Sequence, residues 1–414
     1  MPHGRLRGGR GIAPDTRPRI RMNGRIIIEA VRHERESHAH RIVASIVHGD
    51  RRRELFFAVA PEYGEHLEAD RADCFVVGLL AQAAMDGNDI ESRVPVSEHL
   101  LFQINAFLCG VLGRVYRQRA VSVSAPATAT VMTNAGAVGT GLTCGVDSLY
   151  TVCQYSKTEY PAHNLTHLCL FNVGGHHIAA DEPKEIAEFR GALARRFCAE
   201  QGYAFVEIDS NLHDFAPHYS RYYSLLNAAA VLALPKLFAR YYSSSGYSID
   251  SFYLTGTDLA HFETFVLDAV SGSGLKFYST GAEVSRFEKV KALIGFAPSY
   301  RYLNVCNTHA HNCGVCIKCL RTLYALDVLD ALDKYRDVFD VDAYRRNRAR
   351  YLAECWVRAL LARDSFAQEL YPLLKAKYRV PMLAKLRAAA RFIRSRTKRY
   401  RPAYIRYRLA GGRA

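Results

Sequence analysis

The stretch from Gly139 to Ser148 constrains the fold of this chain more than any other part of its sequence. The apolar run Ala137–Leu142 leads into a turn of small residues, Thr-Cys-Gly, and a helix is expected near Asp147–Tyr155. Small residues let the backbone approach an anion, and the first free amides of the helix would point at that anion with a favourable dipole. The pattern predicts a phosphate-binding loop, and an ordinary turn capped by Asp147 is the alternative. It is not a Walker loop, because no Gly-Lys-Ser/Thr follows.

Four cysteines in one short segment form the second strong pattern. The spacing is C-x6-C-x2-C-x2-C, with Gly314 inside the turn, and the residues are Cys306, Cys313, Cys316 and Cys319. Four thiolates at this spacing suit a tetrahedral structural zinc ion that keeps no open position for catalysis. An iron–sulfur cluster is compatible with the same cysteines. A disulfide framework is not expected in a long chain without an export signal.

Both patterns resemble signatures of one enzyme superfamily. The loop resembles the Ser-Gly-Gly-x-Asp-Ser signature of the PP-loop ATP pyrophosphatases: Thr143 stands for the Ser, Gly145 for the second Gly, and Asp147-Ser148 is intact. Cys144 replaces the first Gly. The run Cys313-Gly-Val-Cys-Ile-Lys-Cys resembles the Cys-Gly-x-Cys-x-x-Cys zinc site of the 7-cyano-7-deazaguanine synthase family, and the resemblance covers about residues 135–330.

The resemblance implies a set of ligands and site residues. Enzymes of this superfamily grip the pyrophosphate of ATP, so ATP, Mg²⁺ near Asp147 and structural Zn²⁺ are implied. The stretch Ser285-Arg286-Phe-Glu288-Lys289 resembles the family's Thr-Lys-x-Glu-x-Val-Lys segment, which sets a cation beside the phosphates. The catalytic residues so implied are Asp147, Ser148 and Arg286. The residues implied in ATP binding are Thr143, Cys144, Gly145, Val146, Asp147, Ser148, Asn172, Gly256, Thr257 and Lys289.

Short apolar runs separated by helical patterns predict an α/β fold over residues 126–300. The runs are Ala137–Leu142, Leu165–Val173, Ala204–Ile208, Ser251–Leu254 and Lys276–Tyr278. Helices are expected near Asp147–Tyr155, Pro183–Gln201 and Ser224–Tyr241. This order predicts a doubly wound parallel sheet that binds its ligand at the carboxyl ends of the strands.

Polar residues follow three of these runs. Asn172 opens Asn-Val-Gly-Gly-His-His, whose backbone is expected beside the adenine; His176 and His177 lack the Glu-x-x-His partner of a metal pair. The segment from Glu207 to Asn211 follows the third run and lies at the site edge or in a turn that caps the next helix. After the fourth run comes Gly256-Thr257-Asp258, where a glycine allows close backbone approach to a ligand.

A thiol at a helix N-terminus has a lowered pKa, which makes thiol transfer by Cys144 a further alternative.

The rest of the chain divides by composition. Residues 1–21 are rich in Gly, Arg and Pro and are expected to be a disordered basic extension. Residues 22–125 are expected to form a small α+β module, residues 126–300 the ATP-binding domain, residues 301–335 the four-cysteine zinc segment with a helix, and residues 336–414 a basic helical region. Within the first module, strands are expected at Arg25–Val31, Leu55–Val59 and Cys74–Val77, and helices near Val77–Met85 and His99–Val115.

The formal net charge of +15 is concentrated at the two ends of the 414-residue chain, and no Asp or Glu occurs from Lys375 onward. Such a block is typical of a patch that binds RNA or another acidic surface, or of a solvated basic helix. The apolar runs are shorter than the roughly 18 residues that span a bilayer. No secretory signal is apparent, so a cytoplasmic protein is expected. The sequence does not determine its oligomeric state.

The expected function is ATP-dependent adenylation of a carboxylate or amide oxygen of a small molecule. Pyrophosphate leaves, and a nitrogen donor such as ammonia or an amine then displaces AMP. No nucleophile with a neighbouring base is visible, and positioning with charge neutralisation is sufficient for adenylation. Two alternatives stay open: a tRNA-modifying PP-loop enzyme that adenylates a base carbonyl, and a non-catalytic, zinc-stabilised nucleic-acid-binding protein.

Overall fold

The computed structural model describes residues 24–174 and 184–409, with the side chains of residue 184 and residues 396–409 left out. The expected extension at residues 1–21 and the pair His176-His177 lie outside the described residues. No helix of the described part is long and apolar enough to cross a membrane.

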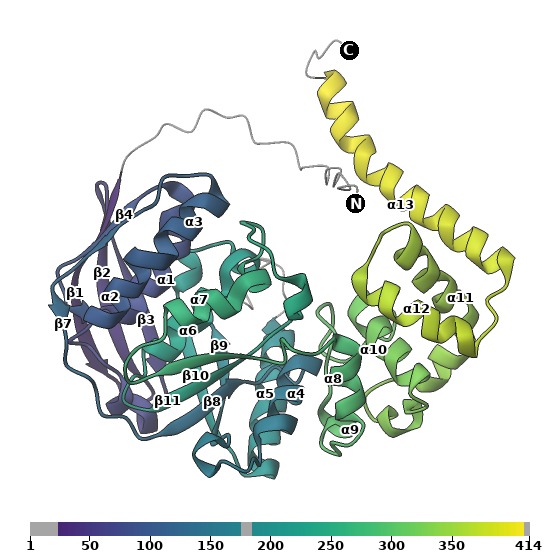
Figure 1. Cartoon of the computed structure of the whole chain (residues 1–414), viewed down its shortest axis with the longest axis horizontal. Coiled ribbons are helices and arrows are strands. Elements are labelled where there is room, and N and C mark those ends of the chain that lie inside the picture. Colours follow the sequence, from purple (N-terminus) through teal and green to yellow (C-terminus); the bar gives the residue numbers. More distant parts are fainter. Residues whose placement is uncertain (1–23, 175–183, 410–414) are drawn as a thin grey trace, which may run out of the picture.

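A ten-stranded sheet forms the centre of the molecule, in the order β12-β11-β8-β9-β10-β3-β2-β1-β4-β6 (Figure 1). Its first five strands are parallel, which confirms the α/β class. These strands are β8 (Ala137–Gly141), β9 (His167–Asn172), β10 (Ala204–Ser210), β11 (Phe238–Ser244) and β12 (Lys276–Thr280). The chain places β9 and β10 on one side of β8 and then β11 and β12 on the other. The order therefore reverses between β8 and β11, and such a switch point is where open α/β sheets bind ligands.

The strands of the N-terminal part belong to the same sheet, which is therefore mixed rather than purely parallel. An antiparallel meander is formed by β1 (Arg25–Arg35), β2 (His40–His48) and β3 (Arg51–Val59). It joins the parallel part through antiparallel pairing of β3 with β10, where Val59 lies opposite Ile208. Two short strands, β4 (Asp89–Ser92) and β6 (Val123–Ser124), complete the sheet, and β5 (Val96–Ser97) pairs separately with β7 (Ala127–Thr128).

Helices cover both faces of the sheet, as expected for a doubly wound fold. One face packs against α1 (Asp73–Asp86), α6 (Tyr219–Leu232) and α7 (Glu263–Ala269). The other face packs against α4 (Val146–Tyr155), α5 (Lys184–Gln201) and α8 (Arg286–Leu293). The remaining short helices are α2 (Glu98–Gln103), α3 (Cys109–Tyr116), α9 (Ser299–Tyr302), a π turn at Ile104–Leu108, and 3₁₀ turns at Pro61–His66, Pro161–His163, Leu212–Asp214, Ile249–Ser251, Leu259–Phe262 and Leu332–Tyr335.

Four helices form the C-terminal region. The core that contains α4 continues into α10 (Ile317–Val328), α11 (Val341–Leu360) and α12 (Ser365–Lys377). The last helix, α13 (Met382–Leu409), packs against α11 through Ala353, Val357 and Ala388. Figure 1 shows α13 running past α11 and α12 and projecting beyond them.

Two strand predictions were wrong. Cys74–Val77 lies inside α1, because this helix is buried on nearly all sides and its sequence lacks the polar stripe that reveals an amphipathic helix. Ser251–Leu254 is a 3₁₀ turn followed by irregular chain. The fourth parallel strand is β11 instead, and it overlaps the helix predicted over Ser224–Tyr241. That helix ends at Leu232, shortly before Pro235, and the aromatic run after the proline is extended.

Candidate functional site

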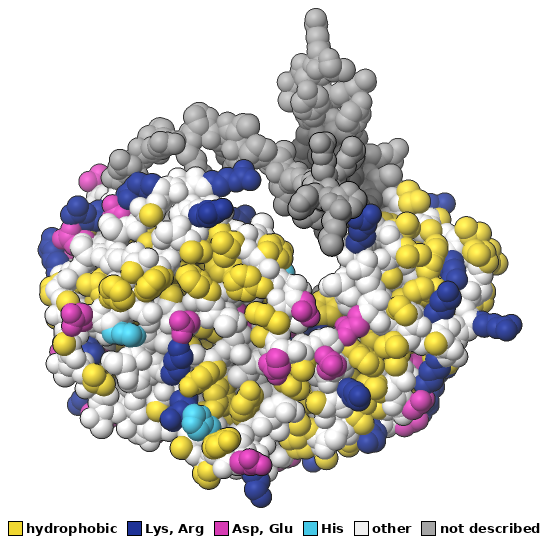
Figure 2. Space-filling view, viewed as in Figure 1, with side chains coloured by type: hydrophobic (Ala, Val, Ile, Leu, Met, Phe, Trp, Pro, Cys, Tyr) yellow, Lys and Arg dark blue, Asp and Glu magenta, His cyan; other side chains and the backbone are white. Residues whose placement is uncertain are grey.

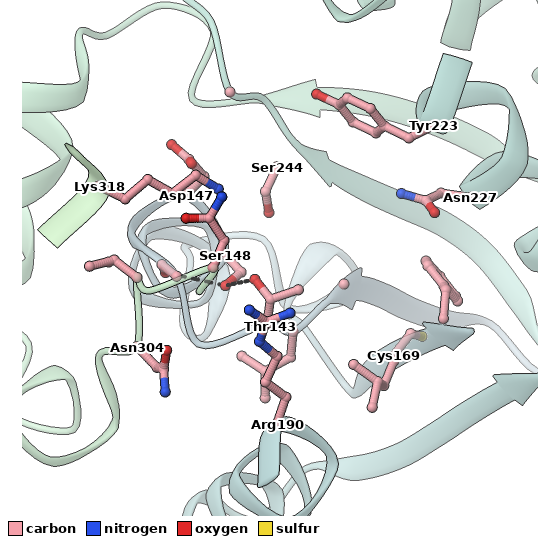
Figure 3. A pocket seen from close by; sticks show the side chains of 18 of the residues that line it. Thr143, Asp147, Ser148, Cys169, Arg190, Tyr223, Asn227, Ser244, Asn304 and Lys318 are labelled. Atoms are coloured by element: carbon pink, nitrogen blue, oxygen red, sulfur yellow. Dashed lines mark hydrogen bonds between the residues drawn. The ribbon is translucent and has the colours of Figure 1, made fainter. Parts of the chain in front are cut away.

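The turn between β8 and α4 has the geometry of an anion-binding loop. Gly145 is extended and precedes α4, and its carbonyl accepts the helical hydrogen bond from the Leu149 N–H, at 3.0 Å. The amides of the three residues between them belong to the first turn, whose N–H groups have no carbonyl within the helix to bond. Ser148 Oγ donates to the Gly145 carbonyl at 3.2 Å and lies 3.5 Å from Thr143 Oγ1 (Figure 3). Two hydroxyls and the helix amides are therefore gathered in one loop.

Cys144 gives this loop its shape rather than a reactive group. Its φ is 55°, in the left-handed region where glycine stands in the resembled signature. The side chain is 1% exposed, and burial raises the pKa of its thiol. The thiol faces the core, so the structure gives no support to the thiol-transfer alternative. The Cys144 carbonyl accepts from the Asn304 N–H at 2.8 Å, which ties the loop to the segment before the cysteines.

Two cations from α8 hold the carboxylate of Asp147. Arg286 Nη1 lies 2.7 Å from one oxygen, and Lys289 Nζ lies 3.2 Å from the other. Lys289 is 2% exposed and also donates to the Ser245 carbonyl at 2.6 Å. A capping box between Ser285 and Glu288 starts α8 at Arg286, and the spacing of three residues puts both cations on one face of the helix. Glu288 thus serves the helix terminus.

The electrostatic balance favours an ionised Asp147. Burial of the carboxyl raises its pKa, but the charges of Arg286 and Lys289 outweigh burial, so the pKa lies below its usual value. A carboxyl with a depressed pKa in the folded state contributes stability above its unfolded pKa. That contribution is lost as the pH falls through the folded-state pKa.

We therefore expect Asp147→Asn to lower the free energy of unfolding by about 2 kcal/mol at neutral pH, because it leaves two cations without their anion. The difference from the wild type should shrink as the pH falls below about 4, the usual pKa of an aspartate, toward the lower folded-state pKa at which the wild-type carboxyl also becomes neutral. Urea unfolding of both proteins over a pH series measures this. Asp268→Asn removes an exposed ion pair with Lys276 and is the control, expected near zero. A difference that grows on acidification contradicts the assignment.

A pocket of about 740 Å³ opens in front of the loop, at the switch point between β8 and β11. Its residues come from the loop, from the ends of β9 and β11, from α5, α6 and the start of α8, and from the segment around the cysteines (Figure 3). Among them are Thr143, Gly145, Asp147, Ser148, Phe171, Arg190, Tyr219, Tyr223, Asn227, Tyr241, Ser244, Arg286, Asn304, Cys306, Thr308 and Lys318.

The half of the pocket near the loop is cationic. Arg190, Arg286 and Lys318 line it, and Asp147 is the one carboxylate among the described lining residues. Arg190 reaches it from α5 and donates to the Cys306 carbonyl at 2.9 Å. Three cations beside the free amides of a helix favour a ligand with several negative charges.

The opposite half of the pocket is aromatic. Tyr219 and Tyr223 of α6 stack with ring centroids 5.8 Å apart, and Phe171 and Tyr241 extend the surface from β9 and β11. Burial raises the pKa of Tyr219 to about 12, so its phenol is neutral at physiological pH. Asn227 Oδ1 is buried there with no hydrogen-bond partner among the described residues. This half offers flat apolar faces and one unused acceptor.

The structure brings some of the predicted residues together and separates others. Thr143, Gly145, Asp147, Ser148 and Arg286 line the pocket. Val146 is buried in the core and does not line the pocket. Lys289 does not line it either, but it contacts Asp147, which does.

The other predicted strand-end residues lie outside the described pocket lining. Asn172 donates to Asp209 at 2.6 Å. Asn211 bonds the backbone of Phe56 and Glu54 and so fastens β3 to the end of β10, and its side chain does not cap the 3₁₀ turn that follows.

Gly256 and Thr257 were predicted in the loop after a strand that does not form. A Cβ on Gly256 would lie 2.7 Å from the Val115 carbonyl, so this glycine permits packing against α3. The carboxyl end of β11 instead brings Ser243 and Ser244 to the pocket. Sequence reasoning also missed Arg190, Tyr223, Asn227 and Lys318; only Lys318 carried a signal, because it stands between two of the clustered cysteines.

The four predicted cysteines converge on one point and could hold a metal ion such as zinc. Their Sγ atoms all lie within 4.8 Å of one another. Cys306 and Cys316 are 3.9 Å apart, and Cys313 and Cys319 are 4.0 Å apart. Zn–S bonds of about 2.3 Å in a tetrahedron require S···S separations of about 3.8 Å. All eleven cysteines are free, so no disulfide framework is present.

Backbone N–H groups in the turn around the cysteines face the sulfur atoms. Gly314 has φ 70°, and the N–H groups of Cys316 and Cys319 donate to the sulfurs of Cys313 and Cys316 at 3.3 and 3.5 Å. Such donors stabilise thiolates. Cys306 also lines the pocket, so the cluster forms part of its wall.

No protein-family model, no curated protein and no solved structure matches this chain. The fold and the site define a class only coarsely: an α/β protein with a loop of small residues before α4, a cationic pocket and a four-cysteine cluster that could hold a metal ion.

Proposed function

We propose that the chain is an ATP-dependent adenylating enzyme of the PP-loop type. The observation that carries the proposal is the loop from Thr143 to Ser148, which lies at the switch point of the sheet and faces a pocket with three cations. Its sequence resembles the PP-loop signature, and its amides, hydroxyls and cations suit a triphosphate.

The proposed reaction has two steps. The acceptor oxygen attacks the α-phosphorus of ATP, and the bond to the β,γ-diphosphate breaks with its electron pair leaving on pyrophosphate. A nitrogen nucleophile then attacks the adenylated carbon, loses a proton and releases AMP with the oxygen. The amides near Gly145, together with Arg286 and Lys318, neutralise the negative charge on the leaving pyrophosphate. No protein nucleophile is required.

Asp147 has two tasks in this proposal. It holds the guanidinium of Arg286 toward the phosphates, and its carboxylate is the group at the loop that suits Mg²⁺. When bound, Mg²⁺ would neutralise phosphate charge. Each carboxylate oxygen bonds one cation and keeps a further lone pair for a metal.

We assign the aromatic half of the pocket to the acceptor. Tyr219, Tyr223 and Phe171 would bind an apolar or flat body, and Asn227 Oδ1 would accept a hydrogen bond from it. The acceptor would then lie across the pocket from the phosphate loop, with its reacting oxygen between the two halves.

We assign the four-cysteine cluster to a structural zinc ion. The four thiolates complete a tetrahedron and leave no position for a substrate. Sulfur atoms all within 4.8 Å of one another suit one ion rather than a cluster of several irons. The zinc would fix the wall that carries Cys306, Asn304 and Lys318.

The proposal is tested by product analysis. The purified chain with ATP and Mg²⁺ is screened against carboxylic acids and amides with ammonia present, and AMP and pyrophosphate are measured. Adenylation predicts equal amounts of AMP and pyrophosphate that depend on one acceptor. ADP and phosphate as products would overturn it, and dependence on a transfer RNA would favour the RNA-modifying alternative. Salt-sensitive RNA binding without ATP turnover would favour the non-catalytic one.

Lys318 supplies a prediction of its own. We expect Lys318→Ala to raise the KM for ATP about tenfold, because one cation of the triphosphate site is lost, and to change the melting temperature little. Steady-state pyrophosphate release measures the first effect. Lys334→Ala removes an exposed lysine of the same region and serves as control. An unchanged KM for ATP would show that Lys318 does not contact the phosphates.

A further inference from the structure

The last helix, α13, carries an exposed aliphatic stripe. Met382, Leu383, Leu386 and Ile393 have exposed fractions of 66%, 58%, 60% and 57%. Leu386 and Ile393 are seven residues apart, close to two helical turns, so they lie on the same side of the helix. Figure 2 shows hydrophobic side chains gathered on the surface of the C-terminal helices, with Lys and Arg among them.

This stripe is not the face that holds the helix in place. Ala384, Ala388 and Phe392 pack with Val357 and Trp356 of α11. Two further contacts fasten the helix: Lys385 Nζ lies 5.8 Å from the centre of the Trp356 ring, and Arg391 lies 3.3 Å from Glu354. The exposed aliphatic side chains take no part in this packing.

The charges that α13 itself carries are all of one sign. Arg387 and Arg394 are exposed and seven residues apart, and Lys385 and Arg391 lie on the same helix. From Lys375 to the end of the chain no acidic residue occurs. An aliphatic stripe bordered by cations is the pattern of a helix that lies in the plane of an anionic membrane surface.

We propose that α13 docks this protein on anionic lipid bilayers. The aliphatic side chains would enter the boundary between headgroups and acyl chains, and the arginines would contact lipid phosphates. RNA fits less well, because aliphatic side chains give no stacking platform for bases. A second copy of this helix fits less well too, because it would bring the same cations close together. The proposal does not depend on the adenylation proposed above.

The test is vesicle flotation of the full chain. Vesicles of phosphatidylcholine alone are compared with vesicles of equal parts phosphatidylcholine and phosphatidylglycerol. We expect binding to the anionic vesicles only, weakening as salt rises. The double variant Leu386→Gln, Ile393→Gln should have an affinity for anionic vesicles at least about tenfold lower, because two aliphatic side chains no longer enter the lipid. Arg387→Gln with Arg394→Gln should reduce binding roughly thirtyfold, because each cation near an anionic surface contributes about fivefold to binding.

The control is Val131→Gln with Ile249→Gln, which replaces two aliphatic side chains of 56% and 53% exposure on the α/β part. It should bind like the wild type, and circular dichroism and melting curves establish that every variant is folded. The proposal is overturned if the wild type binds no anionic vesicles or binds both kinds equally. It is also overturned if the variant Leu386→Gln, Ile393→Gln keeps full vesicle binding. The same holds if this variant loses RNA binding or self-association while its vesicle binding is unchanged.

Discussion

Asp147→Asn should reduce the formation of AMP and pyrophosphate by about a hundred- to a thousandfold while the protein stays folded. The change keeps the size of the side chain but removes the anion that holds Arg286 and Lys289. Arg286 would lose its direction toward the phosphates, and the site would lose its one described carboxylate for Mg²⁺. Pyrophosphate release at saturating ATP measures the effect.

A matched control separates lost catalysis from lost stability. Asp327 is 3% exposed and pairs with Arg348 at 3.0 Å, and it accepts hydrogen bonds from Tyr344 and Tyr378. It lies at the opposite end of α10 from Lys318. Asp327→Asn also removes a buried, paired carboxylate, so it should lower the free energy of unfolding without a comparable loss of turnover. Full activity of Asp147→Asn would exclude the proposed role of the loop.

Local chemistry explains what the sequence could predict. The strand, turn and helix around Gly145 follow from small residues and a helix terminus, and the capping box at Ser285 fixes where α8 begins. The convergence of four cysteines follows from their spacing. Each of these features is decided by residues near one another in the chain.

Tertiary packing explains the rest. The alanine-rich α6 and the aromatic β11 form one apolar run in sequence, which predicts a single helix although the proline between them ends it. That error moved the fourth strand and with it Gly256 and Thr257. Tyr223 and Arg190 reach the pocket because two helices on opposite faces of the sheet extend past the same edge, and no local pattern records this.

Cys316→Ser should destabilise the protein more than either aspartate substitution does. Four-thiolate zinc binding contributes on the order of 10 kcal/mol or more, which is comparable to the whole stability of a typical domain. Cys316 also caps α10, since its sulfur accepts the Cys319 N–H. We expect little soluble protein, less than one metal ion per chain, and a lowered melting temperature in whatever remains soluble. Cys153→Ser, a half-buried cysteine of α4 outside the cluster, should behave like the wild type.

The same cluster should couple metal loss to ATP binding. The Asn304 N–H links the loop before α4 to the cysteine segment, and Arg190 of α5 donates to the Cys306 carbonyl. Removal of the metal should make the cysteine segment mobile, and with it the residues that form these two hydrogen bonds. The pocket wall should therefore loosen before the parallel sheet unfolds. A chelator added to the wild type should therefore weaken ATP binding at temperatures where circular dichroism is still unchanged. Elemental analysis should find one zinc per chain. Iron in its place, or ATP binding that survives complete metal removal, would contradict the structural role assigned to the cluster.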